Sequence, residues 1–496
     1  MENDNKDESI MNEDILEIEP RSMWKHFVDL NAVPRPSKQE ERVIAFMKSF
    51  GADLGLETME DDIGNVIIRK PATPGMENRV PIVMQGHLDM VHQKNSDTDF
   101  DFSTQGIEMI REGDWIRANG TTLGADNGIG VASIMSVLAA DDIPHPAIDA
   151  LFTVDEETGM TGALGLKGGL LNGKILLNLD TEDDDEITIG CAGGINVSAS
   201  GTYTQEIPGR KAAAFKLTVK GLRGGHSGMD IHRGRGNANK LLNRLLYQAT
   251  THCAIRISSI DAGGLRNAIP REAFAGITVR EPRSDELRDC IQQQAAILQS
   301  EYAVTDPGLE ITLEPIELPE SLLTTEFQRK ILWTVYSCPN GVARMSPDIE
   351  GLVQTSDNLA RVHVADGEYK ILCLARGAVD SEKLDLAQAI RCSLEMMGAQ
   401  VEFSGAYPGW APQPDAPIVT LLSDLYQEMF GEKAKVLACH AGLECGILGS
   451  NYPDVQMVSF GPNIRGAHSP DEKVQISSVQ KYWRLLLETL RRIPVA

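Results

Sequence analysis

The sequence predicts an α/β protein in which a mostly parallel sheet flanked by helices is interrupted by a large α+β domain. Two observations support this prediction. Several short apolar runs are each followed by a polar side chain at a turn, a pattern typical of buried strands in a parallel sheet. One of these polar side chains, His468, comes about 290 residues after the last of the others, Asp180, and ordinary loops are far shorter. A folded segment must therefore lie between them.

Four apolar runs are predicted to be strands of the first sheet, and each precedes side chains of the kind that bind metals. The runs are residues 81–86, 150–154, 174–179 and 455–460, and they are followed by His87, by the pair Glu156 and Glu157, by Asp180 and by His468. A glycine-rich stretch, residues 122–128, supplies Asp126. Ligands of open α/β sheets gather outside the carboxyl ends of the strands, so we expect these side chains at one edge.

Two histidines and three carboxylates are more than a single metal ion requires. His87, Asp126, Glu157, Asp180 and His468 would hold two divalent ions, with Asp126 as the bridge. Imidazole and carboxylate together favour zinc, although manganese or cobalt could fill the same oxygen-rich site. Any one of these residues alone would more often be an ordinary surface residue, and only their combination predicts a metal site.

Two further carboxylates have candidate roles beside the metals. Asp89 lies two residues after His87, where it could accept the second ring N–H of a ligating imidazole; the alternative is an exposed loop aspartate. Glu156 directly precedes the candidate ligand Glu157 and could accept a proton from a metal-activated water; the alternative is a solvated acid.

The inserted segment is predicted to contain two α+β units that share an antiparallel sheet. Residues 214–220 alternate in polarity as a half-exposed strand does, and residues 237–249 carry apolar residues at helical spacing. The same theme recurs in strands at 309–315 and 369–374 and in helices at 325–337 and 381–398. The predicted domains are residues 1–194 and 403–496 for the interrupted domain and 195–402 for the insert, with a return hinge at 407–414.

Five sequence blocks resemble the M20 family of zinc peptidases. They are residues 86–89, 123–128, 153–160, 178–180 and 224–228. Residues 440–446 and 461–470 resemble in particular the branch of bacterial aminoacyl-histidine dipeptidases. The resemblance implies that the insert is a lid domain, enlarged relative to many members of the family, whose closure excludes water.

The resemblance also implies a role for each candidate residue. His87, Asp126 and Asp180 would hold one zinc ion, and Asp126, Glu157 and His468 would hold the other. Glu156 would be the general base, and Asp89 would orient a metal ligand. His226, in block 224–228, would reach the scissile carbonyl oxygen and stabilise the oxyanion. The alternative for His226 is a loop histidine between flexible glycines.

Three more residues resemble substrate contacts. Asn267 and Arg376 lie in the insert, and the planar guanidinium of Arg376 suits the free carboxylate of a dipeptide. An ordinary strand-end arginine is the competing interpretation. Glu444 could meet the ammonium group of the substrate or cap a local turn.

The predicted function is therefore hydrolysis of dipeptides by a dinuclear zinc enzyme, with Glu156 acting on a bridging water. The resemblance alone implies dipeptides that end in histidine, such as β-alanyl-histidine. One alternative is an N-acyl amino acid amidohydrolase or an aminopeptidase of the same family. A metal-binding protein without turnover is the other, but binding alone would not need Glu156.

Composition limits the partners and the location. The 496 residues carry 71 acidic against 46 basic side chains, and this formal charge of −25 disfavours nucleic acid and anionic membranes as partners. Residues 1–10 are polar and acidic, unlike a signal peptide, and no apolar run approaches the length of a membrane span. The eight cysteines form no C-x-x-C pair, so we expect reduced thiols in a cytoplasmic protein. A small peptide is the expected partner, and a homodimer is possible.

Overall fold

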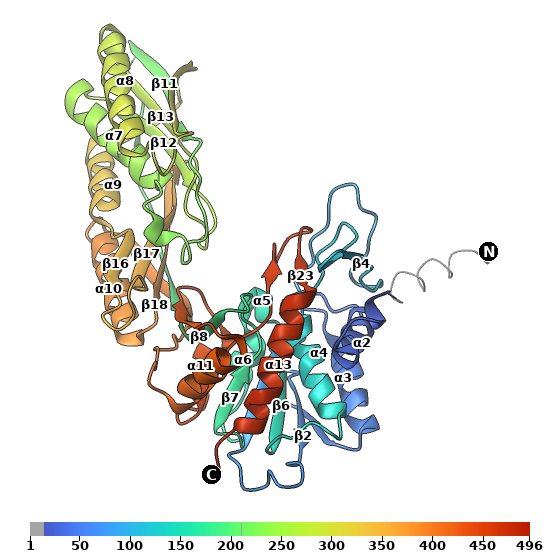
Figure 1. Ribbon diagram of the computed structural model, residues 1–496. Coiled ribbons are helices and arrows are strands. Elements are labelled where there is room, and N and C mark those ends of the chain that lie inside the picture. Colours follow the sequence, from blue (N-terminus) through green and yellow to red (C-terminus); the bar gives the residue numbers. More distant parts are fainter. Residues whose placement is uncertain (1–13, 210) are drawn as a thin grey trace. The chain divides into compact units, whose positions relative to one another are not determined.

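The computed structural model describes residues 14–209 and 211–496, which form two compact units. Of the described residues, the first unit comprises 14–190, Pro412–Ala438 and Leu443–Ala496, and the second comprises 191–209, 211–411 and Cys439–Gly442 (Figure 1). The acidic start of the chain, residues 1–10, lies outside the described residues. The domain boundaries predicted from the sequence remain predictions.

An eight-stranded sheet forms the centre of the first unit. Its middle strands β6, β3, β7 and β21 run parallel to one another, and β1, β2 and β8 pair antiparallel beside them. Strand β3 is buried along its whole length, as its apolar sequence requires. In spatial order the strands are β1 (Glu57–Glu60), β2 (Val66–Lys70), β6 (Ile148–Thr153), β3 (Ile82–His87), β7 (Ile175–Asn178), β21 (Gln456–Ser459), β8 (Glu186–Cys191) and β20 (Lys435–Cys439).

Helices and a small second sheet complete the first unit. Helix α4 is buried on nearly every side because it is built from small and apolar residues, whereas α13 buries only one face. The helices are α2 (Arg21–Asn31), α3 (Glu41–Asp53), α4 (Ala125–Ala139), α5 (Glu156–Gly159), α6 (Thr161–Gly165), α11 (Pro417–Phe430), α12 (Glu444–Asn451) and α13 (Ile476–Arg492). The second sheet contains β22 (Ile464–Arg465), β23 (Lys473–Gln475), β5 (Trp115–Ala118) and β4 (Met109–Glu112).

A nine-stranded sheet forms the second unit, and all of its strand pairs are antiparallel. Its long central strands β17 and β18 are joined by a tight turn at residues 366–367. The strands are β14 (Glu310–Ile316), β11 (Ala212–Lys220), β13 (Ala273–Arg280), β12 (Arg256–Gly263), β17 (Val353–Ala365), β18 (Glu368–Gly377), β9 (Gly193–Thr202) and β19 (Gln400–Tyr407), with β16 (Gly341–Met345) beside β17. Strands β10 (Gln205–Glu206) and β15 (Leu322–Leu323) form a separate pair.

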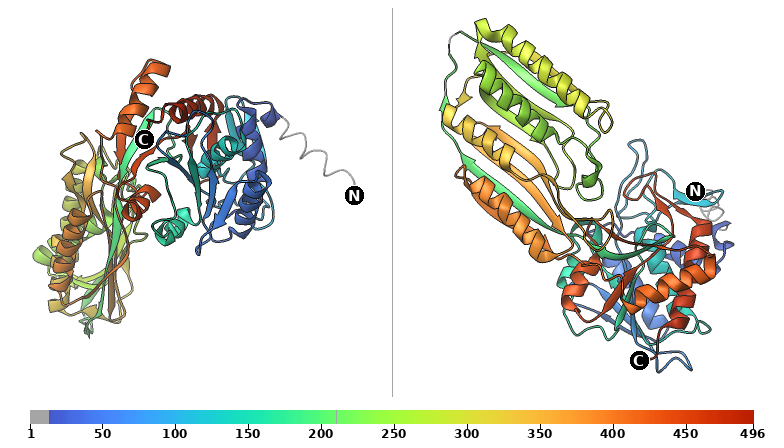
Figure 2. Two further views of the ribbon diagram at one scale, coloured as in Figure 1. Left: turned by 90° about the horizontal axis from the view of Figure 1, so that it is seen from below. Right: turned by 60° about the vertical axis from the view of Figure 1, so that its left-hand side comes forward.

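Four helices cover one face of this sheet (Figure 2). They are α7 (Ala238–Cys253), α8 (Ser284–Glu301), α9 (Thr325–Ser337) and α10 (Asp380–Glu395), and short 3-10 turns occur at Ile231–Arg233 and Glu281–Arg283. Asn237 begins α7 as its N-cap, because its side chain accepts a hydrogen bond from the backbone N–H of Asn239. The apolar faces of these helices pack on the sheet and form the core of the unit.

The fold class predicted from the sequence is confirmed. A mixed sheet whose four central strands are parallel, flanked by helices, is interrupted by an antiparallel α+β insert, and the predicted strands and helices lie at the predicted places. Among the described residues, no helix is long and apolar enough to cross a membrane.

Candidate metal centre and active site

Six side chains gather at the carboxyl ends of the parallel strands of the first unit. His87 is the last residue of β3, Glu156 and Glu157 follow β6, and Asp180 follows β7. Asp126 lies in the first turn of α4, and His468 lies in the loop after β22. We call these six side chains the His/Asp/Glu cluster: His87, Asp126, Glu156, Glu157, Asp180 and His468.

Two groups of three ligand atoms can be drawn within this cluster, and they share one residue. His87, Asp126 and Asp180 place one ligand atom each within 4.8 Å of one another, and so do Asp126, Glu157 and His468. The two oxygens of Asp126 face different histidines, since Oδ1 is 3.0 Å from His87 Nε2 and Oδ2 is 3.2 Å from His468 Nε2. This arrangement suits a carboxylate that bridges two ions.

The remaining distances complete the two groups. Nε2 of His87 lies 3.6 Å from Oδ1 of Asp180, and Nε2 of His468 lies 2.9 Å from Oε2 of Glu157. Glu156 belongs to neither of the two groups, but it forms a third group with His87 and Glu157 at the same distance limit. Its carboxyl is therefore close to the ligands while it remains available for other chemistry.

Asp89 connects one histidine to the turn that carries both glutamates. Its Oδ1 lies 3.3 Å from His87 Nδ1 and accepts a hydrogen bond of 3.0 Å from the backbone N–H of Glu156. Its Oδ2 accepts hydrogen bonds from the N–H of Glu157, at 3.3 Å, and from the hydroxyl of Ser37, at 2.8 Å. Asp89 is fully buried, so the exposed-loop alternative does not describe it. Its contacts turn Nε2 of His87 towards Asp126 and Asp180.

Burial and mutual repulsion raise the pKa of several acids in the cluster. Burial is the main reason that the pKa of Glu156 lies well above its usual range; Asp180 and Glu444 raise it further, and His87 opposes them. Burial likewise raises the pKa of Asp180 to about 6. Hydrogen bonds to Asp126 and Glu157 raise the pKa of His468 to about 11. The cluster therefore favours bound cations, either protons or metal ions.

Glu472 holds the loop that carries Asp126, a role that the sequence did not predict. Its carboxylate is buried and accepts hydrogen bonds of 2.7 to 3.2 Å from four successive backbone N–H groups, those of residues 123–126. Gly124 adopts a left-handed conformation with φ of 69° inside this loop, which glycine permits without strain. Glu472 thus fixes the position of the candidate bridging ligand through the backbone.

Arg35 is a second residue that sequence reasoning missed. Its guanidinium is buried and donates hydrogen bonds to the carbonyl oxygens of Leu88 and Asp89, both at 3.1 Å, and to that of Gly124, at 2.5 Å. Arg35 therefore ties the segment after His87 to the loop before Asp126. No motif in its neighbourhood distinguishes Arg35 from a surface arginine, so only the fold reveals this contact.

Glu444 is buried at the start of α12. Its Oε2 accepts hydrogen bonds from Gln85 Nε2 at 2.6 Å and from Thr153 Oγ1 at 2.7 Å. Burial raises its pKa to about 7. These contacts join strand residues far away in the sequence, so the carboxylate does not serve a local turn. Contact with a substrate ammonium remains a prediction.

The remaining candidates, His226, Asn267 and Arg376, lie in the second unit. Nδ1 of His226 accepts hydrogen bonds from the backbone N–H groups of Gly228, at 3.2 Å, and of Met229, at 3.0 Å. The neutral ring therefore carries its proton on Nε2. The backbone of Asn267 is adjacent, because its carbonyl accepts a hydrogen bond from Ser227 N–H at 2.8 Å.

Arg376 lies beside the same loop. Arg376 is 4% exposed, and its guanidinium contacts the hydroxyl of Tyr407 at 3.1 Å and that of Ser227 at 3.4 Å. Within residues 14–209 and 211–496, no carboxylate forms an ion pair with it. A buried guanidinium that meets only hydroxyl groups is a suitable site for an anion.

Replacing Glu472 tests its effect on the metal cluster. We expect Glu472→Gln to lower zinc affinity by about 10- to 100-fold, because the amide nitrogen would face backbone N–H donors and loosen the loop of Asp126. Zinc affinity is measured by competition with a chromophoric chelator. Asp471→Asn, an exposed neighbour, is the matched control and should bind zinc as the wild type does. Equal affinity in both variants would contradict the assignment.

Acid should destabilise the second unit through His440. Burial, with Arg376 and His226 nearby, lowers the pKa of His440 from 6.5 to about 3, so the folded state disfavours its protonation. Its contribution to the free energy of unfolding is full above pH 6.5 and declines as the pH falls. In denaturant titrations with chelator, the free energy of unfolding falls between pH 6.5 and 5. This fall should be about 2 kcal/mol smaller for His440→Gln than for wild type. His252→Gln, which changes an exposed histidine, is the control. If the free energy of unfolding of His440→Gln fell as much as that of wild type over this pH range, the claim would be refuted.

Comparison with known proteins identifies similar sequences and structures. The cytosol non-specific dipeptidase of Escherichia coli (strain K12) is 42% identical over 481 residues, which cover 97% of this chain and 99% of that protein. The crystal structure of an aminoacylhistidine dipeptidase from Vibrio alginolyticus superposes with a TM-score of 0.90 at 42% identity, over 97% of this chain and 98% of that one. An aminopeptidase PepT from Bacillus cereus ATCC 10987 shares the fold, with a TM-score of 0.56 at 16% identity over 96% of this chain and 99% of that one.

Residues 83–492 match the model of a protein family described as "Peptidase family M20/M25/M40". The members of this family are metal-dependent peptidases, and the two groups of ligand atoms in the His/Asp/Glu cluster agree with that requirement. The extent of these matches confirms the resemblance seen in the sequence: the chain belongs to peptidase family M20/M25/M40.

Proposed function

We propose that the protein hydrolyses dipeptides with two zinc ions bound by the His/Asp/Glu cluster. The observation that supports this most strongly is the pair of ligand groups that share Asp126, with the carboxyl of Glu156 beside them and in neither group. The relatives that match nearly the whole chain are named as dipeptidases, which favours the same substrate class.

The donor set fits two zinc ions. Each group combines one imidazole with two carboxylates, a set that favours zinc over the harder cations. Oε1 of Glu157 and Oδ1 of Asp180 are buried and have no hydrogen-bond partner in the described part of the chain, so both can bind a cation without breaking a hydrogen bond. When bound, the ions act as Lewis acids towards the peptide carbonyl and lower the pKa of water. Manganese and cobalt remain alternatives to zinc.

Glu156 is the proposed general base. Burial and neighbouring acids raise its pKa, and a base is most effective when its pKa lies nearer to neutral pH than that of a free glutamate. The backbone N–H of Glu156 is held by Asp89, and the preceding residue, Asp155, has a left-handed conformation with φ of 53°. Glu156 takes a proton from the attacking water and later gives it to the departing amine.

His226 is the proposed oxyanion donor. Its Nδ1 accepts two backbone hydrogen bonds, so the neutral ring donates from Nε2, as this role requires. The two glycines before it suit the loop, because Gly224 has φ of 64° and Gly225 has φ of 132°, conformations that other residues rarely adopt. The role of His226 predicts a fall in kcat when this ring is removed.

Arg376 is the proposed site for the carboxylate of the substrate. Its buried guanidinium lacks an anionic partner among the described residues, and two hydroxyl groups hold it in place. Asn267 is a second proposed substrate contact, since it adjoins the loop of His226. Glu444 is proposed to receive the ammonium group.

We propose dipeptides with C-terminal histidine, such as β-alanyl-histidine, among broader substrates, because one similar structure is an aminoacylhistidine dipeptidase and one relative is a non-specific dipeptidase. A cytosolic location is proposed from the name of the Escherichia coli relative. A homodimer is a further possibility. An N-acyl amino acid amidohydrolase or an aminopeptidase would use the same metal ligands. Parallel assays of a dipeptide, a tripeptide and an N-acetyl amino acid distinguish these activities.

Separate substitutions of the adjacent glutamates test the mechanism. We expect Glu156→Gln to keep its zinc and to lower kcat for β-alanyl-histidine by about 10²- to 10⁴-fold, because the base is lost. Glu157→Gln should instead release zinc, because it removes a ligand. Kinetics and metal analysis of the same zinc-reconstituted samples provide both readouts. Substantial turnover by a folded, zinc-loaded Glu156→Gln enzyme would exclude Glu156 as the base.

A pair of substrates tests Arg376. Arg376→Lys should raise KM for β-alanyl-histidine by about 10- to 100-fold, since the forked contact to the carboxylate is lost, and should change KM for β-alanyl-histidinamide little. Arg344→Lys, an exposed arginine on β16, is the matched control. A similar change with both substrates would show that Arg376 does not recognise the carboxylate.

A further inference from the structure

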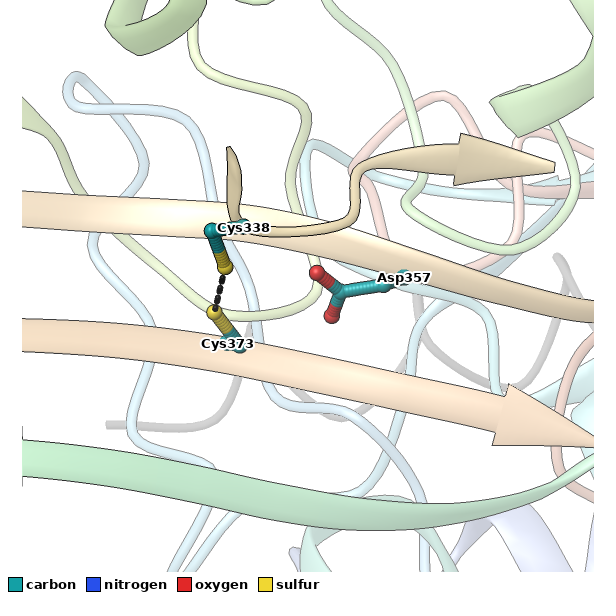
Figure 3. Close-up of side chains that lie close together, drawn as sticks. All are labelled: Cys338, Asp357 and Cys373. Carbon is teal, nitrogen blue, oxygen red and sulfur yellow. Dashed lines mark hydrogen bonds between the residues drawn. The ribbon is translucent and has the colours of Figure 1, made fainter. Parts of the chain in front are cut away.

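A second group of metal-ligating side chains lies inside the second unit, among residues that the proposed reaction does not use. It consists of Cys338, which follows α9, Asp357 on β17 and Cys373 on β18 (Figure 3). The ligand atoms of the three residues lie within 4.8 Å of one another, and the two sulfur atoms are 3.9 Å apart. In the register of β17 and β18, Cys373 pairs with Leu359, which is two residues after Asp357. This register brings Asp357 and Cys373 near each other.

The carboxylate of Asp357 is hard to explain without a cation. Asp357 is 0% exposed, and neither side-chain oxygen has a hydrogen-bond partner in the part of the chain that the structure describes. Burial raises its pKa well above the usual range, although Lys240, the N–H of Asn358 and the thiol of Cys373 lie close enough to oppose this rise. A buried carboxyl with unsatisfied oxygens is destabilising unless it is protonated or binds a cation.

The spacing of the two sulfur atoms fits a shared metal ion. Zinc binds thiolate sulfur at about 2.3 Å, so two sulfur atoms of a tetrahedral site are separated by about 3.8 Å. The observed 3.9 Å agrees with that separation. None of the eight cysteines forms a disulfide in the described chain, and a disulfide would require a separation of about 2.0 Å. A carboxylate oxygen of Asp357 would be the third donor atom of the site.

Lys240 supplies a compensating charge. Its ammonium donates hydrogen bonds to carbonyl oxygens at the end of α9, those of Val335 at 2.6 Å, Tyr336 at 3.3 Å and Cys338. Two thiolates and one carboxylate would carry three negative charges, and a divalent cation together with this ammonium balances them. The assembly would therefore be neutral in a buried environment, where an unbalanced charge is destabilising.

We propose that Cys338, Asp357 and Cys373 bind a soft divalent cation, with zinc preferred, as a structural site of the inserted domain. The ion would join the end of α9 to the neighbouring strands β17 and β18. Thiolate ligands distinguish this site from the His/Asp/Glu cluster, whose candidate ligands are nitrogen and oxygen only.

Cobalt spectroscopy of the full-length protein tests this proposal independently of activity. Protein purified without oxygen and loaded with cobalt(II) should show a near-ultraviolet sulfur-to-cobalt charge-transfer band, which nitrogen and oxygen ligands do not produce. Zinc-loaded protein should show zinc–sulfur scattering at about 2.3 Å in X-ray absorption. Absence of both signals in the folded wild type would overturn the proposal, and so would a disulfide between Cys338 and Cys373 in that sample.

Matched variants assign the signal to these residues. The double variant Cys338→Ser/Cys373→Ser should lose the band and one equivalent of zinc per chain, and Asp357→Asn should weaken zinc binding. The control Cys253→Ser/Cys290→Ser alters a second cysteine pair of the same unit. It should keep the charge-transfer band and the full zinc content. A band that persists in Cys338→Ser/Cys373→Ser would refute the assignment.

Chelator-dependent labelling gives the answer if those variants fail to fold. In wild type, a chelator should increase alkylation of Cys338 and Cys373, read by mass spectrometry, and leave Cys253 and Cys290 unchanged. Labelling of Cys338 and Cys373 that does not respond to the chelator would overturn the proposal.

Discussion

Carboxylates held close together at one end of a sheet require positive charge between them, and the arrangement of the first unit follows from this constraint. Asp126, Glu157 and Asp180 lie within reach of one another, yet two histidines are their main cationic partners. Burial makes such repulsion costly, as the raised pKa values of Asp180 and Glu157 indicate. Divalent ions remove the repulsion, so metal binding and the stability of this edge are expected to be linked.

The chain holds these ligands through its backbone as well as through side chains. Glu472 binds four N–H groups of the loop before Asp126, and Arg35 binds carbonyl oxygens on that loop and beside His87. One carboxylate and one guanidinium therefore fix two ligands that come from different elements. This is why the loop tolerates a glycine-rich sequence: its rigidity comes from partners elsewhere in the chain.

Much of the fold could be predicted from the sequence because apolar runs ending in polar residues are typical of parallel strands. The same pattern predicted His87, Glu157 and Asp180 at one edge, and in the structure each of them lies at or just after the end of a parallel strand. The contact between Glu472 and the loop before Asp126 could not be predicted. The backbone N–H groups of that loop lie about 350 residues earlier, and nothing in the local sequence shows that the carboxylate turns inward. The group of Cys338, Asp357 and Cys373 was missed for a similar reason, since the register of β17 and β18 brings Asp357 near Cys373, and only the packing of the end of α9 on these strands adds Cys338. Strand β17 is buried over residues 353–360, yet residues 354–358 are all polar, so the sequence there shows neither the apolar run nor the alternation that predicts a strand.

The most direct test of a shared metal centre is to locate the zinc ions by anomalous scattering in crystals of the wild type, Asp126→Ala and Asp180→Ala. If Asp126 bridges two ions, the wild type shows two peaks in the His/Asp/Glu cluster, and Asp126→Ala shows none. Asp180→Ala then keeps one peak, beside Glu157 and His468. A single peak in the fully loaded wild type, or two peaks retained in Asp126→Ala, would contradict the account.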